Sequence, residues 1–196
     1  MGQPPQPGRG SIVVWYCLAE QFSSEPIVSL DSQRALLKHY LAAIAYRTQK
    51  ALRDAPAAYP DFSAGQRTRT PVEILRHMTS LLGYSRTLFL GGSYPFKPEP
   101  LATFGHEIDR FHGLLSELGD LLERDVPLKD ISHEQLLQGP LADVMTHIGQ
   151  LALLRRLAGA AVAPENFIYA QVDGQRLGAD QALPARPDAN WPERPA

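Results

Sequence analysis

The sequence contains a single cysteine, Cys17, among its 196 residues. One cysteine can form no disulfide within the chain, which excludes the disulfide-rich scaffolds of small secreted proteins. The same scarcity excludes a zinc site built from several cysteines. Any metal site must therefore rest on histidine, aspartate and glutamate side chains, and the chain has 6 histidines.

The chain also has little net charge and no long apolar run. Its formal net charge is −2 and its sequence pI is about 6.3, so it has no overall basic field to gather nucleic acid or anionic lipid. The apolar stretch at residues 12–19 is far shorter than the roughly 20 residues that cross a bilayer. The features of a signal peptide are missing as well. We therefore expect a cytoplasmic protein with no nucleic-acid or membrane partner.

Composition and periodicity divide the chain into three parts. Residues 1–30 show no sustained period, and residues 161–196 are rich in proline and poor in apolar clusters. Between them, residues 31–160 have apolar side chains at helical spacing, without strand-type alternation or internal repeats. The sequence predicts an all-α fold: an irregular leader, a four-helix bundle, and an extended tail that packs on or near the bundle.

The first two helices have recognisable boundaries. The first is expected over residues 31–54, with Asp31 or Ser32 as its cap. The connection that follows is long enough to cross the bundle. The second helix starts with a capping box and a first-turn proline, Thr70-Pro71-Val72-Glu73. Two glycines at positions 91 and 92 end it.

The last two helices are marked by prolines and apolar spacing. The third follows Pro100, and its apolar residues alternate spacings of four and three. The fourth is expected to start near Pro140 and to end before Gly159. A further capping-box pattern at residues 132–135 predicts a short helical turn ahead of it.

Two of the histidines are predicted to face the core. His77 and His147 each lie among apolar positions of their helices, and a buried imidazole needs a hydrogen-bond partner. His39 and His133 are expected to be exposed or marginal. Two more, His106 and His112, flank the apolar seam of the third helix.

Asp143 lies one helical turn before His147 and on the same side of the helix. The two side chains can hold one ion, and His77 can supply a third ligand from the second helix. Two histidines and a carboxylate leave metal positions open for water and substrate. The alternatives are that each histidine is hydrogen-bonded in an ordinary core and that Asp143 interacts with the helix dipole.

Three stretches resemble the DinB/YfiT-like family of metal-dependent bundle proteins: TPVEILRHMTSLLGY, HEIDRFHGLLSELGDLLE and QGPLADVMTHIGQLALLRRLAG. The most specific piece is Thr146–Leu151, which is similar to the family's His-x-Gly-Gln stretch on the last helix. The resemblance covers residues 31–160 and implies a four-helix bundle with three histidines on a divalent metal. His77 and His147 match two of these positions, whereas Asp143 stands at the third.

The resemblance also implies a ligand chemistry. Zinc and nickel are usual in the family, and a carboxylate at position 143 favours harder ions such as manganese or iron. Gln150 is expected to hydrogen-bond a metal ligand. Characterised relatives include thiol transferases that use bacillithiol or mycothiol, so the implied activity is a thiol S-transferase or hydrolase acting on a small molecule.

Two further expectations accompany this function. Family analogy implies a homodimer, formed through the exposed side of the third helix or through residues 13–16 of the leader. The alternative function is a non-catalytic binding or dimerisation module with a decayed metal site.

Overall fold

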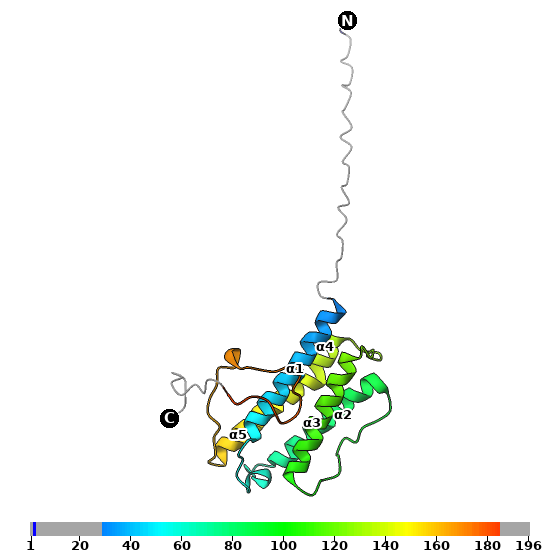
Figure 1. Cartoon of the computed structure of the whole chain (residues 1–196). Helices are drawn as coiled ribbons and strands as arrows, with labels where there is room; N and C mark the ends of the chain where they lie inside the picture. The colour runs from blue at the N-terminus through cyan, green and yellow to red at the C-terminus, as the bar shows by residue number, and fades with distance from the viewer. Residues whose placement is uncertain (1, 3–28, 185–196) are drawn as a thin grey trace.

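The computed structural model describes residue 2 and residues 29–184. Within that part all regular elements are helical and no β-strand occurs, which confirms the prediction of an all-α fold (Figure 1). The long helices are α1 (Leu30–Leu52), α2 (Pro71–Leu90), α3 (Phe104–Glu123) and α5 (Ala142–Leu157). A four-residue helix, α4 (His133–Leu136), precedes α5. No helix in the described part has both the length and the apolar character that crossing a bilayer requires.

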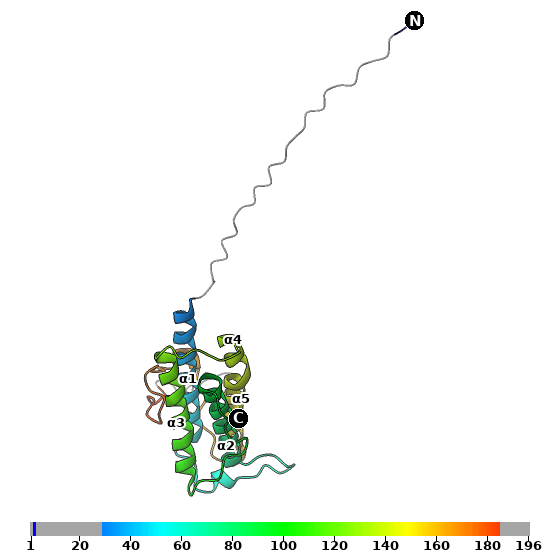
Figure 2. The same ribbon diagram turned by 90° about the vertical axis from the view of Figure 1, so that its right-hand side faces the viewer.

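The four long helices pack side by side in a ring. α1 contacts α3 and α5, and α2 contacts the same two helices, so α1 and α2 occupy opposite corners (Figures 1 and 2). α2 and α3 run in the same direction, as two ion pairs along their length show. Arg76 pairs with Glu107 near the start of both helices, and Arg86 pairs with Glu117 further along.

The core lies inside this ring and consists mainly of leucine. Each fully buried aliphatic side chain contributes roughly 1.5–3 kcal/mol relative to leaving it exposed. A short 3₁₀ turn, Tyr59–Asp61, closes one end of the core, because the Tyr59 hydroxyl donates to the Leu151 carbonyl at 2.7 Å. The side chains that are completely or almost completely buried include Leu41, Ile44, Leu75, Met78, Leu82, Phe111, Leu115, Leu118 and Leu151.

Two of the three predicted helix caps are confirmed. The Glu73 carboxylate accepts the Thr70 N–H at 2.8 Å, and Ser132 and Gln135 form the expected capping box at α4. The predicted cap of α1 is wrong. Ser29 caps it instead, accepting from Ser32 N at 3.2 Å, because Ser29 has the extended backbone of a cap while Asp31 is already helical.

The start of the last long helix also differs from the prediction. Pro140 does not open a free-standing helix but lies inside a π-helical turn, Leu137–Leu141, that joins α4 to α5. Gly139 has a non-helical backbone there (φ −88°, ψ −108°). Because proline has no N–H to donate, the turn accommodates it where a regular helix would lose a hydrogen bond. α5 consequently begins at Ala142 without a side-chain cap.

The segment after α5 packs along the helices as far as the structure describes it. Leu177 is buried, and its carbonyl lies 2.9 Å from Nδ1 of His112 on α3. On α1, the Tyr46 hydroxyl donates to the buried Glu165 carboxylate at 2.6 Å. The predictions for the leader, including Cys17 and the apolar stretch at 12–19, lie outside the described residues.

Candidate metal centre

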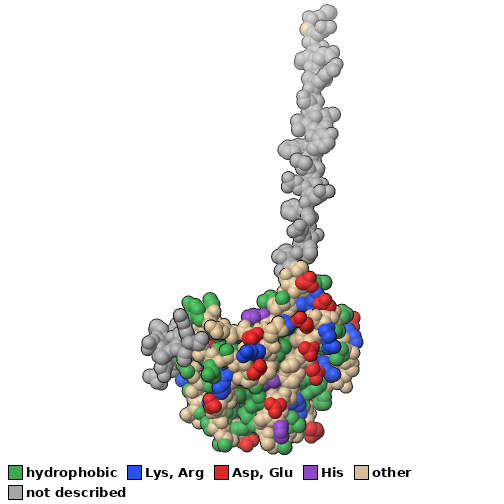
Figure 3. Space-filling model, in the orientation of Figure 1, with side chains coloured by type: hydrophobic (Ala, Val, Ile, Leu, Met, Phe, Trp, Pro, Cys, Tyr) green, Lys and Arg blue, Asp and Glu red, His purple; other side chains and the backbone are tan. Residues whose placement is uncertain are grey.

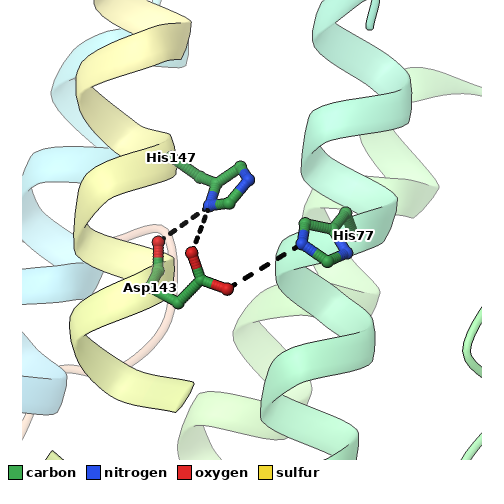
Figure 4. Close-up of side chains that lie close together, drawn as sticks. All are labelled: His77, Asp143 and His147. Carbon is green, nitrogen blue, oxygen red and sulfur yellow. Dashed lines mark hydrogen bonds and ion pairs between the residues drawn. The ribbon is translucent and has the colours of Figure 1, made fainter. Parts of the chain in front are cut away.

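The fold brings His77, Asp143 and His147 together between α2 and α5 (Figure 4). His77 Nε2 lies 4.0 Å from Asp143 Oδ2, and His147 Nδ1 lies 3.1 Å from Asp143 Oδ1. One potential ligand atom from each residue lies within 4.8 Å of the other two. The three side chains singled out from the sequence are therefore neighbours.

Helix register accounts for this convergence. The Thr70–Glu73 capping box fixes where α2 begins, which sets the direction of His77 in its second turn. Asp143 and His147 are one turn apart on α5, a spacing that places both side chains on one face. Because α2 and α5 pack against each other, the two helices present these residues across one interface.

His147 is held in one tautomer by its surroundings. Its Nδ1 lies 2.8 Å from the main-chain oxygen of Asp143 and 3.1 Å from Oδ1 of the same residue. Both atoms are acceptors when the carboxylate is ionised, so Nδ1 carries the proton. The lone pair of Nε2 is then free to bind a cation, as in carboxylate–histidine–metal arrangements.

His77 is half-buried and packs edge-on against His147, with ring centroids 4.7 Å apart. Burial lowers the pKa of His77, Arg69 and His147 lower it further, and the Asp143 carboxylate opposes them. The neutral imidazole, which is the form that binds metals, is therefore favoured at neutral pH. The side chain of Asp143 is 45% exposed, so solvent reaches the cluster from that side.

A cleft of about 530 Å³ opens beside His77. Its walls include Arg69, Arg76 and the loop 96–100, and Phe96 packs edge-on against His77 at 6.2 Å. Sequence reasoning did not assign these residues to the site, because loop 96–100 has no periodicity. The only hint was position: Arg69 immediately precedes the cap of the helix that carries His77.

The other histidines lie elsewhere. His39 and His106 are exposed, and His133 Nδ1 contacts Gln33 Oε1 at 3.0 Å. His112 is only 5% exposed, which its expected place beside the seam did not indicate. Gln150 is exposed, and no hydrogen bond within residues 29–184 joins it to the cluster, so its role as a ligand's partner stays a prediction.

The donor set suits a divalent ion. Two imidazoles and one carboxylate bind zinc, iron, manganese or nickel, and three protein ligands leave further positions open. On the face shown in Figure 3, positive and negative side chains are intermixed and form no stripe of one sign. Comparisons of this chain with protein-family models, with curated proteins and with solved structures found no match.

Proposed function

We propose that this chain is a divalent-metal-binding protein of the DinB-like four-helix-bundle type, with His77, Asp143 and His147 as ligands. The observation that carries the proposal is the convergence of three potential ligand atoms from two helices within 4.8 Å. The tautomer of His147 and the lowered pKa of His77 both favour the metal-binding form of each imidazole.

The activity that fits this arrangement is a metal-dependent thiol S-transfer or hydrolysis. A bound divalent ion lowers the pKa of a thiol or water and so supplies a nucleophile near neutral pH. In this proposal the cleft beside His77 receives the small-molecule substrate, with Phe96 against its apolar part and Arg69 against an anionic part. A low-molecular-weight thiol has both the size and the chemistry for such a cleft.

Metal content is the direct test. Metal-free protein is reloaded separately with Zn, Ni, Mn and Fe, and the bound metal is measured after removal of excess. We expect about one ion per chain, and loss of binding in His77→Ala and in His147→Ala. The matched control is His106→Ala, an exposed histidine on α3 that should leave binding unchanged. Absence of stoichiometric metal, or equal loss in the control, would contradict the proposal.

One observation favours a second candidate, a non-catalytic bundle with a decayed metal site. The Nδ1 proton of His147 is already satisfied by Asp143 without any ion. If this pair is only structural, His147→Gln will change the melting temperature, and neither metal nor chelator will shift the melting of the parent protein. A chelator-sensitive melting temperature in the parent protein counts against this candidate.

The homodimer implied by the family resemblance is part of the proposal. Light scattering coupled to size exclusion, at tens of micromolar chain, distinguishes the 21.6 kDa monomer from twice that mass. A measured mass equal to that of the monomer alone would contradict the dimer and would not affect the metal-binding proposal.

A further inference from the structure

A second cavity lies between α1, α5 and the tail segment 162–167. Its volume of about 410 Å³ is in the range of small-molecule pockets, which span roughly 300–1,000 Å³. Met145, Ile148 and Ala152 of α5 line it. At about 100° per residue these side chains project from the face of α5 turned away from His147, so the cavity is separate from the candidate metal centre.

The cavity wall is mostly apolar and is held in place by side-chain packing. Met145, Ile148 and Ala152 form one side, and Phe167 of the tail forms the other. The Phe167 ring packs edge-on against Tyr46 at 6.3 Å. An apolar chain inserted between these two sides would therefore meet a preformed surface and need little rearrangement.

The charges at the cavity are unbalanced. Arg47, Lys50 and Arg156 are its cations, and Glu165 is its one carboxylate. Lys50 and Glu165 neutralise each other through a buried contact of 2.8 Å. For Arg47 and Arg156, no carboxylate within residues 29–184 comes within ion-pair distance.

Arg47 is the more informative of these two cations. Its guanidinium lies 3.7 Å from the centre of the Phe167 ring, where it is partly shielded from water. Burial lowers the pKa of Arg47 and outweighs the opposing effects of Tyr40 and of the Glu165 carboxylate, which indicates a cation whose lost solvation is only partly replaced. A guanidinium in this setting is suited to two parallel hydrogen bonds with a carboxylate.

We propose that this cavity binds an amphiphilic carboxylate, with its alkyl chain between α5 and Phe167 and its headgroup at Arg47 and Arg156. The apolar wall of the cavity selects the alkyl chain of the ligand, and the guanidinium groups without an ion-pair partner select its negative charge. Binding involves no covalent step and does not depend on the metal proposal.

Calorimetric titration of the full chain with decanoate tests the proposal. We expect one decanoate per chain, and about tenfold weaker binding of decanol and of decyltrimethylammonium, since a charged hydrogen bond is worth roughly 1.5 kcal/mol or more. Arg47→Gln should weaken decanoate binding about tenfold, while Arg67→Gln, an exposed arginine in the loop before α2, should not. Equal binding of decanol and decanoate, or no effect of Arg47→Gln, would overturn the assignment.

A cavity-filling variant tests the location independently. Gly149 lines the cavity, and a Cβ added there meets no atom within 4 Å, so Gly149→Leu should fold and occupy the space. We expect it to abolish decanoate binding. The matched control, Gly113→Leu, also adds a side chain to open space on an exposed helix position and should bind normally. Undiminished decanoate binding by folded Gly149→Leu protein, verified by its melting curve, would refute the location.

Metal binding separates this proposal from the proposed function. Gly149→Leu and Arg47→Gln should retain the metal content of the parent protein, because neither residue belongs to the metal cluster. Failure of decanoate binding with normal metal binding overturns only the cavity proposal. Failure of metal binding with normal decanoate binding overturns only the proposed function.

Discussion

At position 143 a single carboxylate lies between two imidazoles. Oδ1 approaches His147 Nδ1 at 3.1 Å and Oδ2 lies 4.0 Å from His77 Nε2. One oxygen can thus orient His147 while the other contributes to a cation site. In the proposed metal site, the chemistry of residue 143 decides which metal is preferred, because a carboxylate suits harder ions than an imidazole does.

Replacing this carboxylate tests that preference. We expect Asp143→His to raise the affinity for zinc and nickel relative to manganese, because imidazole suits those ions better than a carboxylate does. Competition titrations with a chelator measure the ratio of affinities. Asp120→His, on the exposed side of α3, is the control and should leave the ratio unchanged. An unchanged ratio in Asp143→His would mean that residue 143 does not ligate.

At the scale of elements, Glu107 joins α3 to α2. Its side chain is completely buried and accepts from Arg76 Nε at 2.6 Å and from the Leu101 N–H at 2.8 Å. Burial alone would raise the pKa of Glu107. The Leu101 N–H, Arg76 and Arg110 outweigh it, and the pKa lies below its usual 4.5.

We expect Glu107→Gln to lower the free energy of unfolding by about 3 kcal/mol, since it leaves the partly buried guanidinium groups of Arg76 and Arg110 without their carboxylate partner. Urea unfolding at neutral pH measures this. Glu117→Gln removes an exposed ion pair with Arg86 and should cost at most about 1 kcal/mol. Because the folded pKa of Glu107 is depressed, its contribution is present above pH 4.5 and is lost as the pH falls through the folded pKa. As the pH falls below 4.5, the free energy of unfolding should therefore decrease less steeply in Glu107→Gln than in the parent protein.

The missing side chain at Gly83 allows the loop between α2 and α3 to pack closely against α2. A Cβ at this position would lie 2.3 Å from the Tyr94 ring, which must then move. We expect Gly83→Ala to destabilise the protein by about 1–3 kcal/mol, although alanine is the better helix former. Thermal melting of Gly83→Ala and of Gly113→Ala provides the comparison, because position 113 has open space and should gain stability. Equal melting temperatures of the two variants would contradict this expectation, because they would show that the Tyr94 ring can move away without destabilising the protein.

The helices and the pairing of Asp143 with His147 were predictable because they depend on local spacing, whereas the approach of His77 depends on the packing of α2 against α5. Apolar periodicity and the Thr70 capping box indicated α2, and the one-turn spacing of Asp143 and His147 indicated their shared face. The cap at Ser29 was missed because several polar residues there compete for the same role. The burial of His112 was not predictable, because its hydrogen-bond partner, the Leu177 carbonyl, lies far along the chain. The non-helical backbone at Gly139, next to Pro140, is a feature that apolar periodicity does not report.

At the scale of the whole molecule, the tail is held against the helices by His112. Its Nδ1 contacts the Leu177 carbonyl, while its buried Nε2 has no hydrogen-bond partner within the described residues. Burial lowers the pKa of His112, and the Leu177 carbonyl, Asp180 and Asp109 act in the opposite direction. Protonation would place an unpaired N–H at this buried position.

Stability should therefore depend on pH through His112. Its contribution is fully present above the unfolded pKa of about 6.5 and is lost as the pH falls through the lower folded pKa, because the unfolded chain takes up the proton first. Urea unfolding at pH 7.5 and 5.5 should show a smaller stability difference in His112→Gln than in the parent. His106→Gln, exposed on the same helix, should behave as the parent does. An unchanged pH difference in His112→Gln would contradict this role.

The placement of α1 and α2 at opposite corners of the ring also governs how the chain reaches its native state. Neither α1 with α2 nor α3 with α5 makes the extended contact of a local helical hairpin. The packing partners of α1 are thus α3 and α5, which are distant in sequence, whereas α2 packs most extensively on α3, the long helix that follows it. Pairings between distant segments form more slowly than local ones. A fragment ending after α2 would contain two helices with little to bury against each other, so α1 is expected to become stable only after α3 is present.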